Sequence, residues 1–133
     1  MTSQDLIIIN GKAFSTLLAL TSEEQEKGLM YMDFPPPIMT FVYPKPFYNS
    51  FWMKNCQSPL DIVFVRNGKV LAIHNGIPYS TSIIDCREPS DLVIEFPAGT
   101  CKIEHINVGD NIETRFSDAS QKRIFFLKNG FVY

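Results

Sequence analysis

The sequence predicts a mainly β fold, a single-domain β-sandwich or partly closed barrel with one short helix near residues 22–28. Apolar and polar side chains alternate in many short stretches, and Gly, Pro, Asn and Asp separate these stretches at close intervals. One segment alone carries the start signal of a helix. With 133 residues, the chain is long enough for one domain with a substantial core, and we expect residues 1–133 to form it.

The first half of the chain contains four expected strands. They are residues 6–9, 14–20, 38–43 and 51–55. Asn10-Gly11 joins the first two, and this dipeptide favours a tight hairpin because both residues tolerate positive φ. Pro44 and Pro46 follow the third strand, and we expect them outside any central strand because proline donates no ladder hydrogen bond.

The expected helix begins after the second strand. Thr21-Ser22-Glu23-Glu24 has the pattern of a capping box, in which the Thr21 hydroxyl accepts the amide of Glu24 and the Glu24 carboxylate reaches back. Gly28 is placed to end the helix with positive φ. Because the helix is short, its stability must come from packing rather than from propensity.

The second half contains further strands separated by turns. They are residues 61–66, 69–74, 92–96, 102–106 and 111–116. Asn67-Gly68 is the clearest hairpin signal in the chain. Residues 77–89 are expected to form a longer loop, and such loops often carry function.

The C-terminal segment is expected to form a β-hairpin. Its two apolar runs, residues 123–127 and 131–133, lie on either side of Asn129-Gly130. We therefore predict that residues 117–133 are a hairpin extension of the β core.

Composition and charge exclude several classes of partner. The net charge of −2 and the pI near 5.6 argue against nucleic acid, which requires a basic excess. The apolar run at residues 6–9 is far too short for a signal peptide or a membrane span. Cys56, Cys86 and Cys101 are odd in number and form no C-x-x-C, so free thiols are expected. We therefore expect a soluble cytoplasmic protein with no membrane or nucleic-acid partner.

The candidate site surrounds the single Trp of the chain. In an extended strand, Trp52 and Lys54 would share one face while Asn55 lies on the other. A Lys in an apolar strand needs a partner, because a buried unpaired ammonium is costly. Asp61 and Glu95 are the candidate partners.

Glu95 interrupts an otherwise apolar strand. Alternation predicts that Leu92, Ile94 and Phe96 face the core while Glu95 and Val93 face the opposite side of the sheet. A carboxyl in such a strand either completes a structural ion pair or lines an opening.

Three functions fit this constellation. In the first, the domain binds a small polar ligand such as a carbohydrate, with Trp52 as a stacking face and Lys54, Asn55, Asp61 and Glu95 as polar contacts. In the second, Lys54 and a carboxylate form a buried structural pair, and the protein is a non-catalytic interaction or accessory domain. In the third, the Lys and carboxylates form the acid–base site of a hydrolase or lyase.

No metal or cofactor is expected. His74 and His105 belong to no cluster of His, Cys or carboxylate with ligand spacing, although Cys101 lies four residues before His105. Cys56 as a nucleophile would need a base, and neither His is near it in sequence. No glycine-rich phosphate loop or nucleophile elbow is present.

Several motifs together resemble those of domain-of-unknown-function family 192. They are Gly28-Leu29-Met30, Phe51-Trp52-Met53-Lys54-Asn55, Pro59-Leu60-Asp61-Ile62 with Phe64, Gly68-Lys69-Val70, Ile94-Glu95 with Ala98-Gly99, and Val108-Gly109-Asp110. The resemblance covers residues 12–116, the expected β core. It implies a compact β-sandwich of jelly-roll type, and it implies no established activity.

The chain departs from the family pattern at several positions. Met32 stands where members often carry Arg, Ile38 stands where a Gly is common, and Cys56 stands where Thr is common. If the Arg belongs to a binding site in other members, the resemblance implies that the function is altered or lost in this chain.

Overall fold

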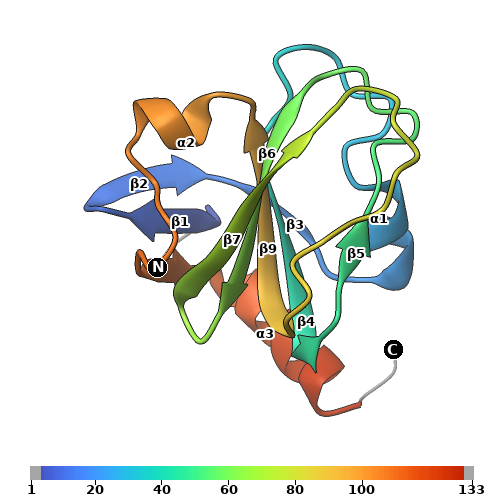
Figure 1. Ribbon diagram of the computed structural model, residues 1–133. Helices are drawn as coiled ribbons and strands as arrows, with labels where there is room; N and C mark the ends of the chain where they lie inside the picture. The colour runs from blue at the N-terminus through green and yellow to red at the C-terminus, as the bar shows by residue number, and fades with distance from the viewer. Residues whose placement is uncertain (1–3, 131–133) are drawn as a thin grey trace.

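The structure is a computed structural model that describes residues 4–130 (Figure 1). It is mainly β, as predicted, with several open sheets packed as a sandwich; the jelly-roll connection stays a prediction. The strands are β1 (Leu6–Ile9), β2 (Lys12–Ser15), β3 (Leu17–Ala19), β4 (Met39–Phe47), β5 (Ser50–Phe51), β6 (Leu60–Arg66), β7 (Lys69–Gly76), β8 (Ile84–Asp85), β9 (Ser90–Pro97) and β10 (Ile112–Arg115). The helices are α1 (Ser22–Lys27), α2 (Thr100–Ile103) and α3 (Asp118–Lys128). None of the described helices is long and apolar enough to cross a membrane.

A five-stranded sheet is the centre of the fold. Its strand order is β3-β4-β9-β6-β7, and only the β3–β4 pair is parallel. A second sheet has the order β10-β1-β2, and β5 pairs with β8. In Figure 1, β1, β2 and α2 lie on one side of the central sheet, whereas α1 and β5 lie on the other. The central strands are therefore covered on both faces.

The two faces of the central sheet belong to two separate apolar cores. Leu92, Ile94 and Phe96 pack in one core with β1, while Val93 packs in the other. This alternation confirms the predicted orientation of the strand. Glu95 therefore lies on the same face of the sheet as Val93.

Helix α1 begins as the sequence predicts. The Thr21 hydroxyl accepts a hydrogen bond from the Glu24 amide at 3.1 Å, and Glu24 Oε1 accepts one from the Thr21 amide at 3.1 Å. Gly28 ends the helix with a φ of 48°. A Cβ at this position would lie 3.3 Å from the ring of Phe41, so both the backbone and the packing favour glycine here.

The predicted hairpin turns at the two Asn-Gly pairs are confirmed. Asn10 and Gly11 connect β1 to β2, and Asn67 and Gly68 connect β6 to β7, all four with positive φ. The expected strand at residues 14–20 is divided at Thr16, because the Leu17 amide turns to the Ile38 carbonyl of the neighbouring chain segment.

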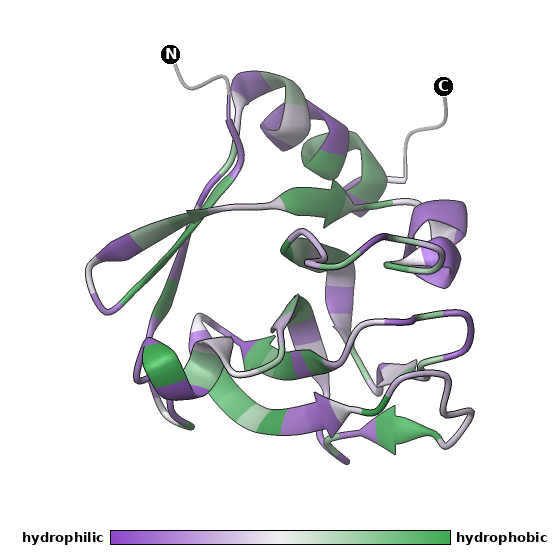
Figure 2. Cartoon of the chain, turned by 90° about the horizontal axis from the view of Figure 1, so that it is seen from above, coloured by the Kyte–Doolittle hydropathy of each residue, from purple (hydrophilic) through white to green (hydrophobic). Residues whose placement is uncertain are grey.

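The C-terminal hairpin prediction is wrong for the residues that the structure describes. Residues 118–128 form helix α3, whose first turn is capped by the Ser117 hydroxyl at 3.1 Å from the Ser120 amide. Asn129 and Gly130 end the helix rather than turn a hairpin. Figure 2 shows hydrophilic and hydrophobic segments along this helix. The second expected strand, residues 131–133, lies outside the described residues.

Residues 102–106 are also not a strand. They belong to helix α2 and the turn that follows it. The Asp61 carboxylate accepts the amides of Gly99 at 3.1 Å and Cys101 at 2.9 Å, which satisfies donors at the start of this helix. This cap comes from a residue 38 positions earlier in the chain, so local sequence patterns could not reveal it.

Strand β4 continues through the two prolines that we expected outside any central strand. Its pairing with β9 shifts register between Val42 and Phe47, and no ladder partner is found at Pro44 or Pro46. The missing amide donors therefore cost no ladder hydrogen bond, which is how proline is tolerated at a bulge.

Candidate functional site

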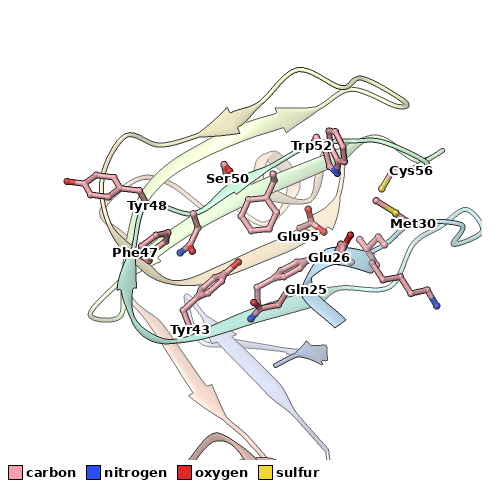
Figure 3. Close-up of a pocket in the computed structure, with 16 residues that line it drawn as sticks. Gln25, Glu26, Met30, Tyr43, Phe47, Tyr48, Ser50, Trp52, Cys56 and Glu95 are labelled. Atoms are coloured by element: carbon pink, nitrogen blue, oxygen red, sulfur yellow. The ribbon is translucent and has the colours of Figure 1, made fainter. Parts of the chain in front are cut away.

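A pocket of about 320 Å³ opens beside the central sheet, between α1, β4 and the segment from Phe47 to Trp52 (Figure 3). It contains two of the predicted site residues, Trp52 and Glu95. Figure 3 shows Glu95 in the middle of the pocket, with Phe47 and Tyr48 toward one end and Trp52 and Cys56 toward the other.

Glu95 is the most unusual residue of this pocket. Its side chain projects from β9 on the face shared with Val93, between the strand partners Met39 and Ile62. The residue is only 4% exposed, and no hydrogen bond or ion pair from the described residues reaches its carboxyl group. Burial raises the pKa of Glu95 to about 8, because the charged form loses its hydration.

Tyr43 and Cys56 are titratable residues of the pocket whose pKa values are influenced by Glu95. Burial raises the pKa of Cys56 to about 11, and the charge of Glu95 adds to the shift. The pKa of Tyr43 is raised by the same two causes. Both groups are therefore neutral at physiological pH, and Cys56 lacks the thiolate character that a nucleophile requires.

Six of the sixteen residues that line the pocket are aromatic. The rings of Phe41 and Phe51 meet edge to face with their centroids 5.0 Å apart. Phe47 and Tyr48 are each 66% exposed, and Trp52 is 42% exposed. The inner rings are thus fixed by packing, whereas the rim offers aromatic faces to solvent.

Polar side chains at the rim are used internally. Gln25 Nε2 donates to the carbonyls of Ala19 at 3.2 Å and Val42 at 3.0 Å. Asn49 Nδ2 donates to the Ser90 carbonyl at 2.9 Å and to its hydroxyl at 2.8 Å. These bonds attach α1 and the segment after β4 to the sheet, and they leave the amide donors occupied.

The structure places Trp52, Lys54 and Asn55 in a loop, not in the predicted strand. Only Ser50–Phe51 of this segment is extended, since Asn55 adopts a φ of 59° and the Cys56 amide turns back to the Met53 carbonyl. Asn55 Nδ2 donates to the Tyr31 hydroxyl at 2.9 Å. A shallow depression next to the main pocket is lined by Trp52, Lys54 and Asn55 among others.

Lys54 does not form the buried ion pair that we considered. It is exposed, and its ammonium lies 5.1 Å from the centroid of the Trp52 ring. Within residues 4–130, no carboxylate forms a salt bridge with it. The reason is the loop geometry, which turns Lys54 out to solvent and leaves Glu95 without a lysine partner.

Asp61 lies apart from the other candidate residues. Val63, two positions further along β6, and Phe96, the partner of Asp61 on β9, both belong to the core opposite Glu95. Its carboxylate serves the amides of α2. Asp61 therefore lies outside the lining of the pocket that contains Trp52 and Glu95, and its carboxylate caps α2 instead.

Lys54→Ala is expected to change the free energy of unfolding by less than about 1 kcal/mol, because only an exposed cation–π contact is lost. Urea denaturation of both proteins measures this. A loss of about 3 kcal/mol would instead indicate that Lys54 forms a buried ion pair with a carboxylate.

Sequence reasoning missed Tyr43 and the residues of α1 that line the pocket. The signal for Tyr43 was available, because alternation along β4 places it on one face with Met39 and Phe41. The contribution of α1 depends on its tertiary position, which no local pattern encodes.

No metal centre is found in the part of the chain that the structure describes, since no three His, Cys, Asp or Glu side chains lie close enough to hold an ion.

Met32 stands where the family that the sequence resembles is expected to carry Arg. It packs against the core beside the pocket and is absent from the pocket lining.

Comparison with known proteins supports the resemblance. The sequence profile of DUF192, described as an uncharacterised ACR, matches residues 6–114. A crystal structure from Sinorhizobium meliloti 1021, described as a "putative transcription regulator", is 34% identical with a TM-score of 0.75, covering 84% of this chain and 92% of that one. A protein of unknown function from Novosphingobium aromaticivorans is 32% identical with a TM-score of 0.75, covering 83% of each chain. No curated protein matches the sequence significantly.

Proposed function

The chain belongs to the uncharacterised DUF192 family, and we propose that it is a binding domain for a small polar ligand that docks against Glu95. One observation carries this proposal: a buried carboxyl group faces a pocket and has no hydrogen-bond partner among the described residues. Buried ionisable groups are costly unless they are paired. A group of this kind in an apolar pocket is a candidate functional site, and a ligand would supply the missing partner.

The aromatic walls support binding of a compact molecule with an apolar side. Phe47, Tyr48 and Trp52 present ring faces at the rim, and such faces stack on the carbon framework of ligands, including carbohydrates. A pocket of about 320 Å³ is at the small end of the range for small-molecule sites.

An acid–base enzyme is the second candidate, and the raised pKa of Glu95 favours it. A general acid or base works best with a pKa near the operating pH, and burial raises that of Glu95 to about 8. The hydrolase or lyase with two cooperating carboxylates is not supported, because Asp61 lies on the other face of the sheet. Any such enzyme would use Glu95 with Tyr43 or with a group of the substrate.

Fluorescence of Trp52 offers a direct test, since it is the single Trp of the chain and lines the pocket. We expect a screen of sugars, polyols, amines and organic acids to yield a compound that changes this fluorescence saturably. At 100 times its dissociation constant, the compound should stabilise the protein by about 2.7 kcal/mol.

Phe47→Ala and Glu95→Ala should each weaken the binding of such a compound by about tenfold or more. Phe125→Ala is the matched control, because Phe125 is 57% exposed and lies outside this pocket. Affinity that is unchanged in both pocket variants, or a screen without any saturable response, would contradict the proposal.

A further inference from the structure

We propose that the ligand is a small organic cation, an amine or quaternary ammonium whose positive group docks at Glu95 among the aromatic rings. This inference depends on the ligand-binding function proposed above and adds the chemical class of the ligand. Its basis is the combination of a buried acceptor, aromatic walls and occupied amide donors in one pocket.

Once Glu95 has lost its proton, the charge inside the pocket is negative. Glu26 and Lys27 also line the pocket, but both are exposed residues of α1, so one charge of each sign lies at the mouth. Glu95 is the only buried ionisable group among the lining residues that becomes charged below pH 10, since Tyr43 and Cys56 stay neutral. Above the pKa of Glu95, an anionic ligand would therefore meet a like charge in the interior.

The side-chain amides of the pocket wall offer no free N–H donor, so the Tyr43 hydroxyl and the carboxyl group of Glu95 are the polar groups left in the interior. The amide donors of Gln25 and Asn49 are bound to backbone and Ser90 acceptors. A sugar needs donors and acceptors from its site, whereas an ammonium group needs only acceptors and π faces. The carboxylate of Glu95 provides an acceptor, and the surrounding rings provide the π faces.

The chain already places a cation on one of these rings. The ammonium of Lys54 lies 5.1 Å from the centroid of Trp52, on the side of the neighbouring depression. Phe47, Tyr48 and Phe51 line the main pocket with Trp52, so several more ring faces are available to a ligand. Aromatic clusters of this kind are a known solution for quaternary ammonium recognition.

Binding of a cation should depend on pH. Burial raises the pKa of Glu95 to about 8, so the group must lose its proton before it can pair with an ammonium. The groups facing it are Tyr43 on β4, Cys56 in the loop after β5, and Glu26 and Lys27 on α1; its neighbour on β6 is Ile62. His74 lies one strand beyond Ile62 in the same row, against the ring of Phe64.

The test compares choline with its neutral isostere 3,3-dimethylbutan-1-ol, with 1,4-diaminobutane as a primary amine and glucose as a polyol. Dissociation constants are measured at pH 6, 7, 8 and 9 by Trp52 fluorescence and by calorimetry. We expect one of the two cations to bind at pH 9 at least about tenfold more tightly than the neutral isostere. Its affinity should rise by up to about tenfold per pH unit below pH 8 and level off above it.

Glu95→Gln isolates the carboxyl group, because it keeps the size of the side chain and leaves His74 in place. We expect this variant to bind choline and the isostere with similar affinity and to lose the pH dependence. Phe47→Ala is a second check, because this exposed rim residue can be replaced without disturbing the core. It should weaken the binding of the cation more than the binding of the neutral isostere.

The outcomes separate the two proposals. Binding of glucose or of 3,3-dimethylbutan-1-ol without binding of either cation would overturn the cationic ligand and leave the binding function standing. Cation binding that is unchanged in Glu95→Gln would also overturn it. Absence of any response, in this series and in the wider screen, would overturn both.

Discussion

Replacement of Glu95 by Gln is expected to remove a decline in stability that the wild-type protein shows as the pH rises from about 4.5 to 8. The folded protein keeps the Glu95 proton up to a pKa of about 8, whereas the unfolded chain loses it near the ordinary value of 4.5. Between these values the folded state binds more protons than the unfolded state. The free energy of unfolding therefore falls with increasing pH in this window.

The size of the effect is on the order of 5 kcal/mol across the whole window. Below pH 4.5 the two proteins should have similar stability, and above pH 8 the Gln variant should be the more stable one. Urea denaturation at pH 4, 6, 7 and 9 measures the difference. Glu23→Gln is the control, since Glu23 is exposed on α1, and parallel curves for wild type and Glu95→Gln would contradict the assignment.

Asp61→Ala should produce the second large effect, a loss of about 3 kcal/mol in the free energy of unfolding. The substitution removes the carboxylate that accepts hydrogen bonds from the amides of Gly99 and Cys101. Both amides, at the start of α2, then lack this acceptor. Losing hydrogen bonds to a buried charged group, with the donors left unpaired, costs about this much. Urea denaturation at pH 7 measures the loss.

Asp61→Asn is the matched variant, because the amide oxygen can still accept from both donors. We expect it to be destabilised by less than Asp61→Ala and to bind any pocket ligand with wild-type affinity. A folded Asp61→Asn protein that has lost ligand binding would return Asp61 to the site and contradict its structural role.

The strands could be predicted from the sequence wherever alternation and turn residues agree. The turns at Asn10-Gly11 and Asn67-Gly68 and the capping box at Thr21 are encoded by neighbouring residues, and all three are found in the structure. Leu92, Ile94 and Phe96 face the predicted core because alternation is a local property of an extended chain.

The errors arose where distant contacts decide the local conformation. Residues 102–106 have an apolar pattern suited to a strand, yet the Asp61 carboxylate caps a helix at Thr100–Ile103. At the C-terminus, the Asn129-Gly130 pair can end a helix as well as turn a hairpin, and the sequence offers the same dipeptide for both.

Two of the five candidate site residues line one pocket. Trp52 and Glu95 reach it from segments about forty residues apart. Lys54 and Asp61 were assigned to the same site because charges near an apolar strand need partners. The structure satisfies each of them separately, Lys54 in solvent over Trp52 and Asp61 on the amides of α2.

The most direct test of the account is the titration of Glu95 itself, followed by the carboxyl ¹³C chemical shift in the ligand-free protein, with Glu95→Gln to assign the resonance. A buried carboxyl group without a protein partner should titrate with a pKa of about 8. A pKa at or below the ordinary value of 4.5 would show that the group is hydrated or paired. That result would contradict the proposal that Glu95 is an unpaired carboxyl group to which a ligand binds.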